Sequence, residues 1–263
     1  KEQIEKTIWT SNAEGEKIRI IRTSSEGEEA QWLASEIQRR HLGAHVPYPH
    51  FAILYRTNAQ SRALEEALRR QNIPYRIYGG VSFYQRKEVK DVLAYFRLAI
   101  NPNDEDALLR VINFPARGIG QTTLNKLISI SHESGVNLWH AITQMPLAKS
   151  GIAAATAGKL EAFAGMIKAF SALLYKKNAF DLAETIVTQT GIRRHYLEEG
   201  TPESLVRHEN IEELLSGIRD FTSREPDIPN ESDTADMRTL DEFMQDIVLL
   251  TDSDFEPGQQ KND

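Results

Sequence analysis

Two glycines around one isoleucine, at residues 118–120, form the motif of this chain that points most directly to chemistry. A helical pattern ends at Asn113-Phe114-Pro115, and a new one begins near Thr122. A Gly-apolar-Gly turn between two short helices is typical of a helix-hairpin-helix. Its glycines let the backbone approach a phosphate, and the free N–H groups of the second helix point at the anion. The motif therefore predicts a phosphate-binding turn.

Side chains beside this turn add hydrogen-bond donors, and Ile119 is expected to anchor the hairpin in a core. The predicted contact set is Arg117, Gly118, Ile119, Gly120, Thr122, Thr123 and Lys126. Contacts of this kind position a duplex but read no sequence. The usual motif has proline directly before Gly-Ile-Gly, whereas Ala116 and Arg117 intervene here. An ordinary turn that needs glycine for a positive φ is therefore a second interpretation.

A second candidate site is Arg56-Thr57-Asn58, which follows the short apolar run Phe51–Tyr55. Such a run predicts a buried strand of a parallel sheet, and ligands of open α/β sheets bind beyond the carboxyl ends of the strands. Arg56 suits a phosphate, and Asn58 suits either a base edge or the N-cap of the following helix. Spacing alone favours the simple cap for Asn58.

Other residue patterns support neither a catalytic residue nor a metal site. Ala157-Gly158-Lys159-Leu160 lacks the earlier glycine and the Ser/Thr after lysine that a phosphate-binding loop requires, so we interpret it as a helix surface. His41, His45 and His50 lie in a Pro/Gly-containing loop without a carboxylate pattern. No Ser/His/Asp order indicates a hydrolase. We therefore expect no catalytic residue and no metal.

Charge is distributed unevenly along the 263 residues, whose net charge is −7. Residues 225–263 carry twelve acidic and two basic side chains, a local charge of −10, which leaves +3 for residues 1–224. Residues 51–126 hold twelve Lys/Arg and seven Asp/Glu. Phosphate binding requires a local basic surface rather than a basic protein. Charge alone nevertheless favours the simpler interpretation, a solvated charged face.

The overall composition indicates a folded protein of one large domain or two ordinary ones. Hydrophobic residues make up 40% and charged residues 26%. No apolar run approaches the roughly 18 residues of a membrane span, and the polar stretch Lys1–Thr10 is not a signal peptide. The absence of cysteine excludes disulfides and thiolate chemistry, and fits a reducing cytosol. Because the first residue is Lys1, we interpret the chain as a piece of a longer one.

The predicted secondary structure that must position these sites changes near residue 80, from alternating strands and helices to helices alone. Alternating or apolar runs predict strands at 17–23, 51–55 and 74–78, with helices at about 25–40 and 59–71 between them. This order predicts part of a parallel sheet with right-handed crossovers. From residue 87 to 250 only helical patterns follow. The predicted fold class is α/β plus all-α, a partial parallel-sheet portion followed by a helical domain.

Four segments carry a family resemblance: residues 51–62 (FAILYRTNAQSR), 73–80 (IPYRIYGG), 83–98 (FYQRKEVKDVLAYFRL) and 110–120 (RVINFPARGIG). They resemble the UvrD/PcrA-type superfamily 1A DNA helicases, the UvrD/Rep family. The similarity covers nearly the whole chain, dense from 51 to 127 and loose from about 140 to 250. The family shares the two residues before Gly-Ile-Gly, so the departure from the usual hairpin does not weaken its role.

The resemblance implies a fragment of a 3′–5′ ATP-dependent DNA helicase. It implies that residues 1–85 are part of the second RecA-like motor domain (2A), 86–255 the helical insertion 2B, and 256–263 a linker returning toward 2A. The family's Walker A lysine and its acidic Mg²⁺ motif are missing from these residues, so ATP and Mg²⁺ belong to the parent protein. The fragment is expected to be non-catalytic.

Site roles and partners also follow from the resemblance. Arg56 and Asn58 match positions that touch single-stranded DNA, and the hairpin residues fall where 2B holds duplex DNA. The implied partners are single-stranded and duplex DNA without sequence preference, the rest of the helicase chain, and repair proteins bound through 2B, in a bacterial cytoplasm and without a membrane. The alternative is a stand-alone helix-hairpin-helix adaptor that binds DNA or a protein.

Overall fold

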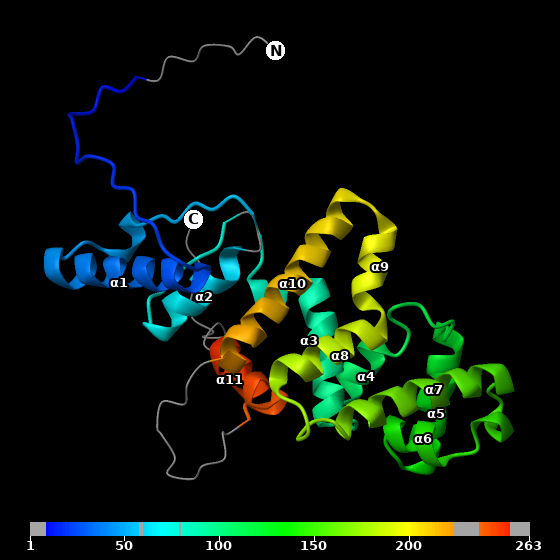
Figure 1. Ribbon diagram of the computed structural model, residues 1–263. Helices are drawn as coiled ribbons and strands as arrows, with labels where there is room; N and C mark the ends of the chain where they lie inside the picture. The colour runs from blue at the N-terminus through cyan, green and yellow to red at the C-terminus, as the bar shows by residue number, and fades with distance from the viewer. Residues whose placement is uncertain (1–8, 58–59, 79, 224–236, 253–263) are drawn as a thin grey trace, which may run out of the picture.

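The computed structural model describes residues 9–57, 60–78, 80–223 and 237–252, and this part of the chain is built from helices (Figure 1). The α-helices are α1 (Glu26–Ala44), α2 (Ser61–Arg70), α3 (Lys87–Ile100), α4 (Glu105–Val111), α5 (Gln121–Ser134), α6 (Leu138–Gln144), α7 (Ala154–Ser171), α8 (Ala179–Thr190), α9 (Ile192–Glu199), α10 (Pro202–Ser223) and α11 (Leu240–Asp252). Short 3-10 helices include η1 (Tyr48–His50), η3 (Phe83–Gln85) and η4 (Leu147–Ser150).

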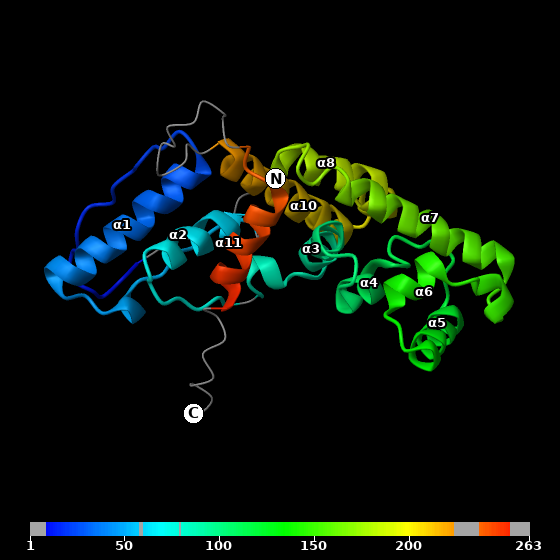
Figure 2. The same cartoon turned by 90° about the horizontal axis from the view of Figure 1, so that it is seen from below.

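Two apolar clusters hold these helices together. The smaller cluster joins α1 to α2 and is closed by Ile73. The larger cluster begins at Phe83 and runs through α3 to α11, as far as Ile247. Figures 1 and 2 show α1 and α2 at one end, α3, α8, α10 and α11 in the middle, and α4–α7 at the other end. The chain passes from one cluster to the other between residues 73 and 83.

The parallel sheet predicted for the first 80 residues is wrong for the part of the chain that the structure describes. Segments 17–23, 51–55 and 74–78 form no strand in the described part of the chain, and no backbone hydrogen bond joins any of these three segments to another. Phe51 and Ile53 pack on the α1–α2 cluster, whereas Ala52 between them is exposed and Leu54, the next residue, is 95% exposed. Alternating burial therefore arises from packing on helices, whereas a strand also requires a hydrogen-bonded neighbour. The RecA-like α/β portion is corrected to an all-α arrangement.

Several helix boundaries are set by local capping residues. Ser25 Oγ accepts the Glu28 backbone N–H at 3.2 Å, and the Glu28 carboxylate accepts the Ser24 N–H at 2.8 Å, so a capping box begins α1. Asp104 caps α4 through the Ala107 N–H at 3.0 Å. Gly191 ends α8 in the left-handed region, with φ of 76°. Local sequence thus fixes where these helices begin and end.

No helix among the described residues is both long and apolar enough to cross a bilayer. The longest, α10, buries a face that includes Ile211, Leu214 and Ile218, and exposes charged residues along its length. This pattern is that of an amphipathic helix packed on a protein core.

We expect amide hydrogen exchange to be slow across residues 156–221 and fast across 17–23 and 51–55. Helix amides are hydrogen-bonded and packed in the larger cluster. Among the described residues, the amide of Phe51, which donates to the Tyr48 carbonyl oxygen, is the only one of the two extended segments with a backbone acceptor. Exchange followed by mass spectrometry measures the difference, with α1 and α2 as an internal reference. Equal protection of 51–55 and α8 would show that the extended segments are paired after all.

Candidate nucleic-acid interface

The turn between α4 and α5 has the backbone geometry of a closed hairpin. Gly118 has a φ of +71°, a conformation that side-chain-bearing residues rarely adopt, and Ile119 is completely buried. Asn113 Oδ1 accepts hydrogen bonds from the backbone N–H groups of Arg117, at 2.9 Å, and Ile119, at 3.0 Å. The Asn113 side chain therefore closes the turn, a role that the sequence did not reveal because an isolated asparagine carries no pattern.

The exposed side of this turn presents unpaired backbone donors. Gly120 occupies the N-cap position of α5 without a side-chain cap, and the N–H groups of Gly120, Gln121 and Thr122 find no acceptor in the described part of the chain. Thr122 is exposed and Thr123 is half-buried. Helix N-termini carry partial positive charge and favour anions. A phosphate oxygen therefore fits the chemistry of this surface.

Arg117 holds the turn from inside. Its guanidinium donates to the carbonyl oxygens of Val111 and Phe114, each at 3.0 Å, and to the Tyr95 hydroxyl at 2.7 Å. Burial raises the pKa of Tyr95 to about 12, so this hydroxyl stays protonated. In the described geometry the Arg117 donors face protein oxygens. Its phosphate contact remains a prediction, and its structural role is an additional finding.

Lys126, in contrast, keeps its charge at the surface. The side chain is exposed, and Nζ donates to the carbonyl oxygen of Gly151 at 2.9 Å. No carboxylate of the described residues pairs with it. The ammonium group therefore remains available to an anion.

The second candidate site is described only in part. Arg56 is exposed, and the backbone N–H groups of Arg56 and Thr57 donate to Gln60 Oε1 at 2.9 and 3.1 Å. Asn58 lies outside the described residues. The N-cap position of α2 is Gln60, and the cap predicted for Asn58 falls outside the described residues. Because α2 and the α4–α5 turn lie toward opposite ends of the molecule in Figures 1 and 2, the two candidate sites are not brought together.

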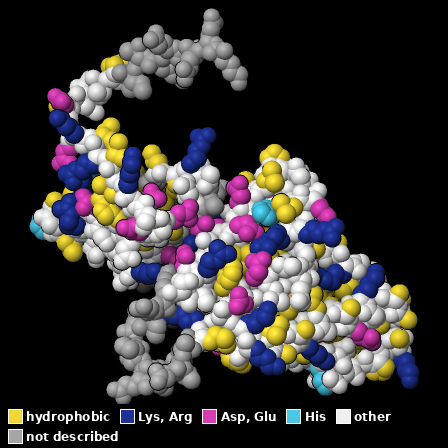
Figure 3. Space-filling view, viewed as in Figure 1, with side chains coloured by type: hydrophobic (Ala, Val, Ile, Leu, Met, Phe, Trp, Pro, Cys, Tyr) yellow, Lys and Arg dark blue, Asp and Glu magenta, His cyan; other side chains and the backbone are white. Residues whose placement is uncertain are grey.

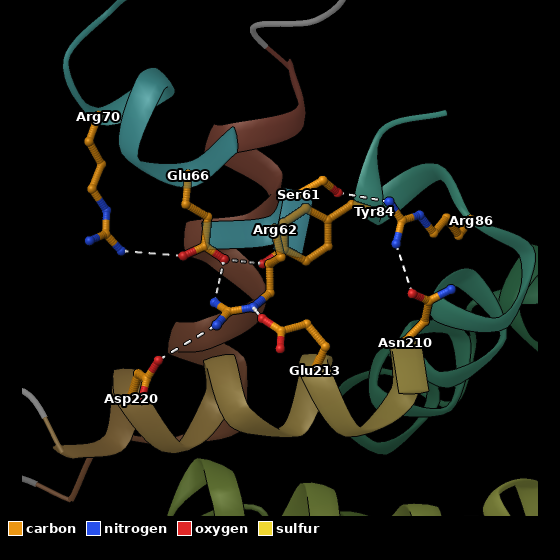
Figure 4. Close-up of polar contacts among 9 residues, drawn as sticks. All are labelled: Ser61, Arg62, Glu66, Arg70, Tyr84, Arg86, Asn210, Glu213 and Asp220. Carbon is orange, nitrogen blue, oxygen red and sulfur yellow. Dashed lines mark hydrogen bonds and ion pairs between the residues drawn. The ribbon is translucent and has the colours of Figure 1, made fainter. Parts of the chain in front are cut away.

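A buried ion cluster connects α2 to α10 (Figure 4). Arg62, only 4% exposed, pairs with Glu66 at 3.0 Å and, across the interface, with Glu213 at 2.6 Å and Asp220 at 3.6 Å. Burial by itself lowers the pKa of Arg62. The carboxylates of Glu66 and Glu213 have the larger combined effect and raise the pKa of Arg62 above its usual value. Burial also raises the pKa of Glu213. The Arg62 cluster thus joins the two apolar clusters through charge.

A neighbouring hydrogen-bond chain strengthens the same junction. Arg86, just before α3, donates to Ser61 Oγ at 2.7 Å and to Asn210 Oδ1 at 2.8 Å (Figure 4). Asn210 Nδ2 in turn donates to Glu88 at 2.6 Å. The first turn of α2 is therefore tied to both α3 and α10. Sequence analysis missed Arg62 and Arg86 because their partners on α10 lie more than 100 residues away in the sequence.

We expect Gly217→Ala to destabilise the chain by about 1–3 kcal/mol, because overpacking of a filled interior has this cost. A Cβ at position 217 would lie 2.6 Å from Arg62 Nη1 and 2.8 Å from its Cζ. The guanidinium can move away only by leaving its carboxylates. Urea unfolding midpoints measure the effect.

Gly165→Ala is the matched control. Gly165 lies within α7, is exposed, and has no atom within 4 Å of an added Cβ. Alanine there should stabilise the helix by about 0.5–1 kcal/mol. If both variants shifted the midpoint in the same direction by similar amounts, Arg62 would not be the reason for glycine at 217.

Comparison with known proteins agrees with the resemblance at the level of the family. The family model of the UvrD-like helicase C-terminal domain matches residues 1–261. The ATP-dependent DNA helicase PcrA of Leuconostoc citreum is 38% identical over 259 residues, which cover 98% of this chain and 34% of that protein.

Two further relatives give the same result. PcrA of Bacillus subtilis (strain 168) is 37% identical over 249 residues, covering 95% of this chain and 32% of the relative. DNA helicase II of Escherichia coli (strain K12) is 37% identical over 224 residues, covering 84% and 31%. The chain spans about a third of the length of these curated relatives. It belongs to the family of UvrD-like helicase C-terminal domains.

Proposed function

We propose that this chain is the duplex-holding part of a 3′–5′ ATP-dependent DNA helicase. Residues 86–255 act as the insertion 2B, and residues 1–85 belong to the motor subdomain 2A, although the described residues of this part form no sheet. Residues 256–263, the proposed return linker, lie outside the described part. The match of the family model to residues 1–261 favours this proposal over a stand-alone adaptor.

One observation carries the proposal: the first turn of α5 presents unpaired backbone N–H groups on an exposed surface. Gly118 and Gly120 add no side chain of their own to this surface, and Ile119 fixes it to the core. Backbone donors bind phosphate oxygens without reading bases. A helicase must hold every sequence that passes through it, so recognition of the sugar-phosphate backbone fits the task. Arg56 and Asn58 are proposed to contact single-stranded DNA.

ATP chemistry does not fit the residues of this chain. The sequence has no Gly-Lys-Ser/Thr run for the phosphates, and no group of three metal-ligating side chains occurs among the described residues. We therefore propose that ATP and Mg²⁺ bind to other parts of a longer protein, in the cytoplasm of a bacterium. Repair proteins that dock on 2B belong to the same proposal.

Duplex binding by the chain should be weak and salt-sensitive. Neutralising two phosphates gives a slope of about −2 in a plot of log affinity against log salt concentration. We expect the double variant Gly118→Val, Gly120→Val to lose this binding, because side chains would occupy the approach of the phosphate. Fluorescence anisotropy with a labelled duplex measures both quantities.

Gly135→Val is the control for strain. Gly135 also has a positive φ, +65°, and ends the same helix, α5, at its far terminus. The Gly135→Val substitution should lower the stability of the chain without abolishing duplex binding. If the Gly118, Gly120 double variant stayed folded and bound duplex as well as the parent chain, the hairpin assignment would be wrong.

We expect the 263-residue chain to hydrolyse no ATP, with or without single-stranded DNA, because it lacks a phosphate-binding loop. Phosphate release can be compared with a mock purification. ATP turnover that rises with added single-stranded DNA would contradict the proposal that ATP binds to other parts of a longer protein.

A further inference from the structure

The backbone between the extended segment 51–55 and α2 is held by one side chain, that of Gln60. Its Oε1 atom accepts the backbone N–H groups of Arg56, at 2.9 Å, and of Thr57, at 3.1 Å. The backbone N–H of Gln60 in turn donates to the Thr57 carbonyl oxygen at 3.2 Å. Three hydrogen bonds therefore tie the backbone of Arg56 and Thr57 to a single glutamine.

The extended segment does not fix the position of Arg56 by itself. Among the described residues, only the Phe51 amide of this segment has a backbone acceptor, the Tyr48 carbonyl oxygen. Leu54, two residues before Arg56, is 95% exposed, so packing does not hold this end of the segment either. Without an acceptor from the protein, exposed N–H groups bond to water, which fixes no backbone direction. The direction in which the chain leaves the segment therefore depends on Gln60.

Gln60 is itself attached to a well-anchored part of the molecule. It occupies the N-cap position of α2, and the next two residues, Ser61 and Arg62, are buried. Arg86 donates to Ser61 Oγ at 2.7 Å, and Arg62 pairs with Glu213 of α10 at 2.6 Å. The start of α2 is thus held from two distant parts of the chain, and Gln60 transfers this fixed position to the turn that precedes it.

The side chain of Arg56 is available to an anion. It is exposed and pairs with no carboxylate of the described residues. On the face drawn in Figure 3, basic and acidic side chains are interspersed over the end of the molecule formed by α1 and α2. A surface of mixed charge attracts a polyanion only weakly over long range. The contribution of one arginine to DNA binding then depends on how well that arginine is positioned.

We propose that Gln60 is a positioning residue for single-strand binding, which holds the backbone of Arg56 so that its guanidinium meets a phosphate of single-stranded DNA. This inference rests on the proposed function, which assigns the phosphate contact to Arg56, and adds a residue that acts through Arg56. Ordering a flexible segment on binding lowers affinity, and a turn that is formed in advance avoids this cost. Gln60 therefore affects the affinity for a single strand without changing the number of phosphates contacted.

The substitution Gln60→Met keeps the length of the side chain and removes its acceptor oxygen. We expect the affinity of the 263-residue chain for single-stranded DNA to fall about fivefold, the cost of immobilising one flexible side chain. The slope of log affinity against log salt concentration should not change. Arg56→Gln removes a charge and should reduce the magnitude of this slope by about 0.7. Fluorescence anisotropy with a labelled thymidine oligonucleotide at low salt measures both quantities.

Gln71→Met is the matched control, because it makes the same chemical change at the other end of α2. Gln71 occupies the C-cap position of this helix and donates to Ser35 Oγ at 3.0 Å. The length of α2, about 15 Å, separates the two glutamines. Gln71→Met should leave single-strand affinity unchanged.

Amide hydrogen exchange tests the hydrogen bonds of Gln60 in the absence of DNA. The amides of Arg56 and Thr57 should exchange more slowly in the parent chain than in Gln60→Met. Gln60→Glu retains an acceptor oxygen and should retain the slow exchange, which nuclear magnetic resonance measures for each amide. Equal exchange rates in the parent chain and in Gln60→Met would overturn the proposed positioning.

A double variant shows whether Gln60 acts through Arg56. Two residues that serve the same contact have non-additive effects, whereas independent residues have additive ones. In the Arg56→Gln background, Gln60→Met should therefore cause no further loss of single-strand affinity. A further fivefold loss would show that Gln60 affects binding independently of Arg56, and would overturn the inference.

The single variants separate this inference from the proposed function. If Arg56→Gln weakens single-strand binding while Gln60→Met binds like Gln71→Met, the positioning role is wrong and the contact proposed for Arg56 stands. If Arg56→Gln changes neither the affinity nor the salt slope, the single-strand contact proposed for Arg56 fails, and the role of Gln60 fails with it.

Discussion

The buried guanidinium of Arg62 is the constraint on which the arrangement of the two apolar clusters depends. An unpaired cation in a protein interior costs several kcal/mol, so carboxylates must accompany it. One of them, Glu66, lies on its own helix, while Glu213 and Asp220 belong to α10. Separating α2 from α10 would leave the charge with a single partner. Burial of Arg62 therefore opposes relative movement of the clusters and explains why α10 has a glycine at 217 facing it.

This junction also links the two candidate DNA sites mechanically, although they lie far apart. The turn that carries Arg56 leads directly into α2, whose first residues are held by Arg86 and, across the interface, by α10. Helix α10 packs on α3, and α3 packs on the α4 that leads into the hairpin. A chain of packed helices thus runs from one site to the other. Under the proposed function, single-strand and duplex contacts would be held in a fixed relation as long as the Arg62 cluster is intact.

Local features were predictable from sequence, and pairings between distant residues were not. The Ser25–Glu28 capping box, the Asp104 cap and the Gly191 terminus each depend on residues within four positions, so their patterns are complete in the sequence. The sheet was predicted wrongly because apolar alternation reports which side chains are buried, and not whether a neighbouring strand is present. The Asn113 closure of the hairpin and the short helix α9 (Ile192–Glu199) carried no periodic signal.

Three arginines and two lysines of this fold differ in the groups that they contact, and the difference bears on phosphate binding. Arginines such as Arg62, Arg110 and Arg193 each meet carboxylates of the protein, because a planar guanidinium with five donors suits fixed, partly buried pairs. Among the described residues, Lys126 and Lys159 instead donate to the neutral carbonyl oxygens of Gly151 and Gly118, respectively, at exposed turns. A carbonyl orients an ammonium group without neutralising it, so the positive charge is positioned in advance and still uncompensated. That is the electrostatic condition for binding phosphate at low ordering cost.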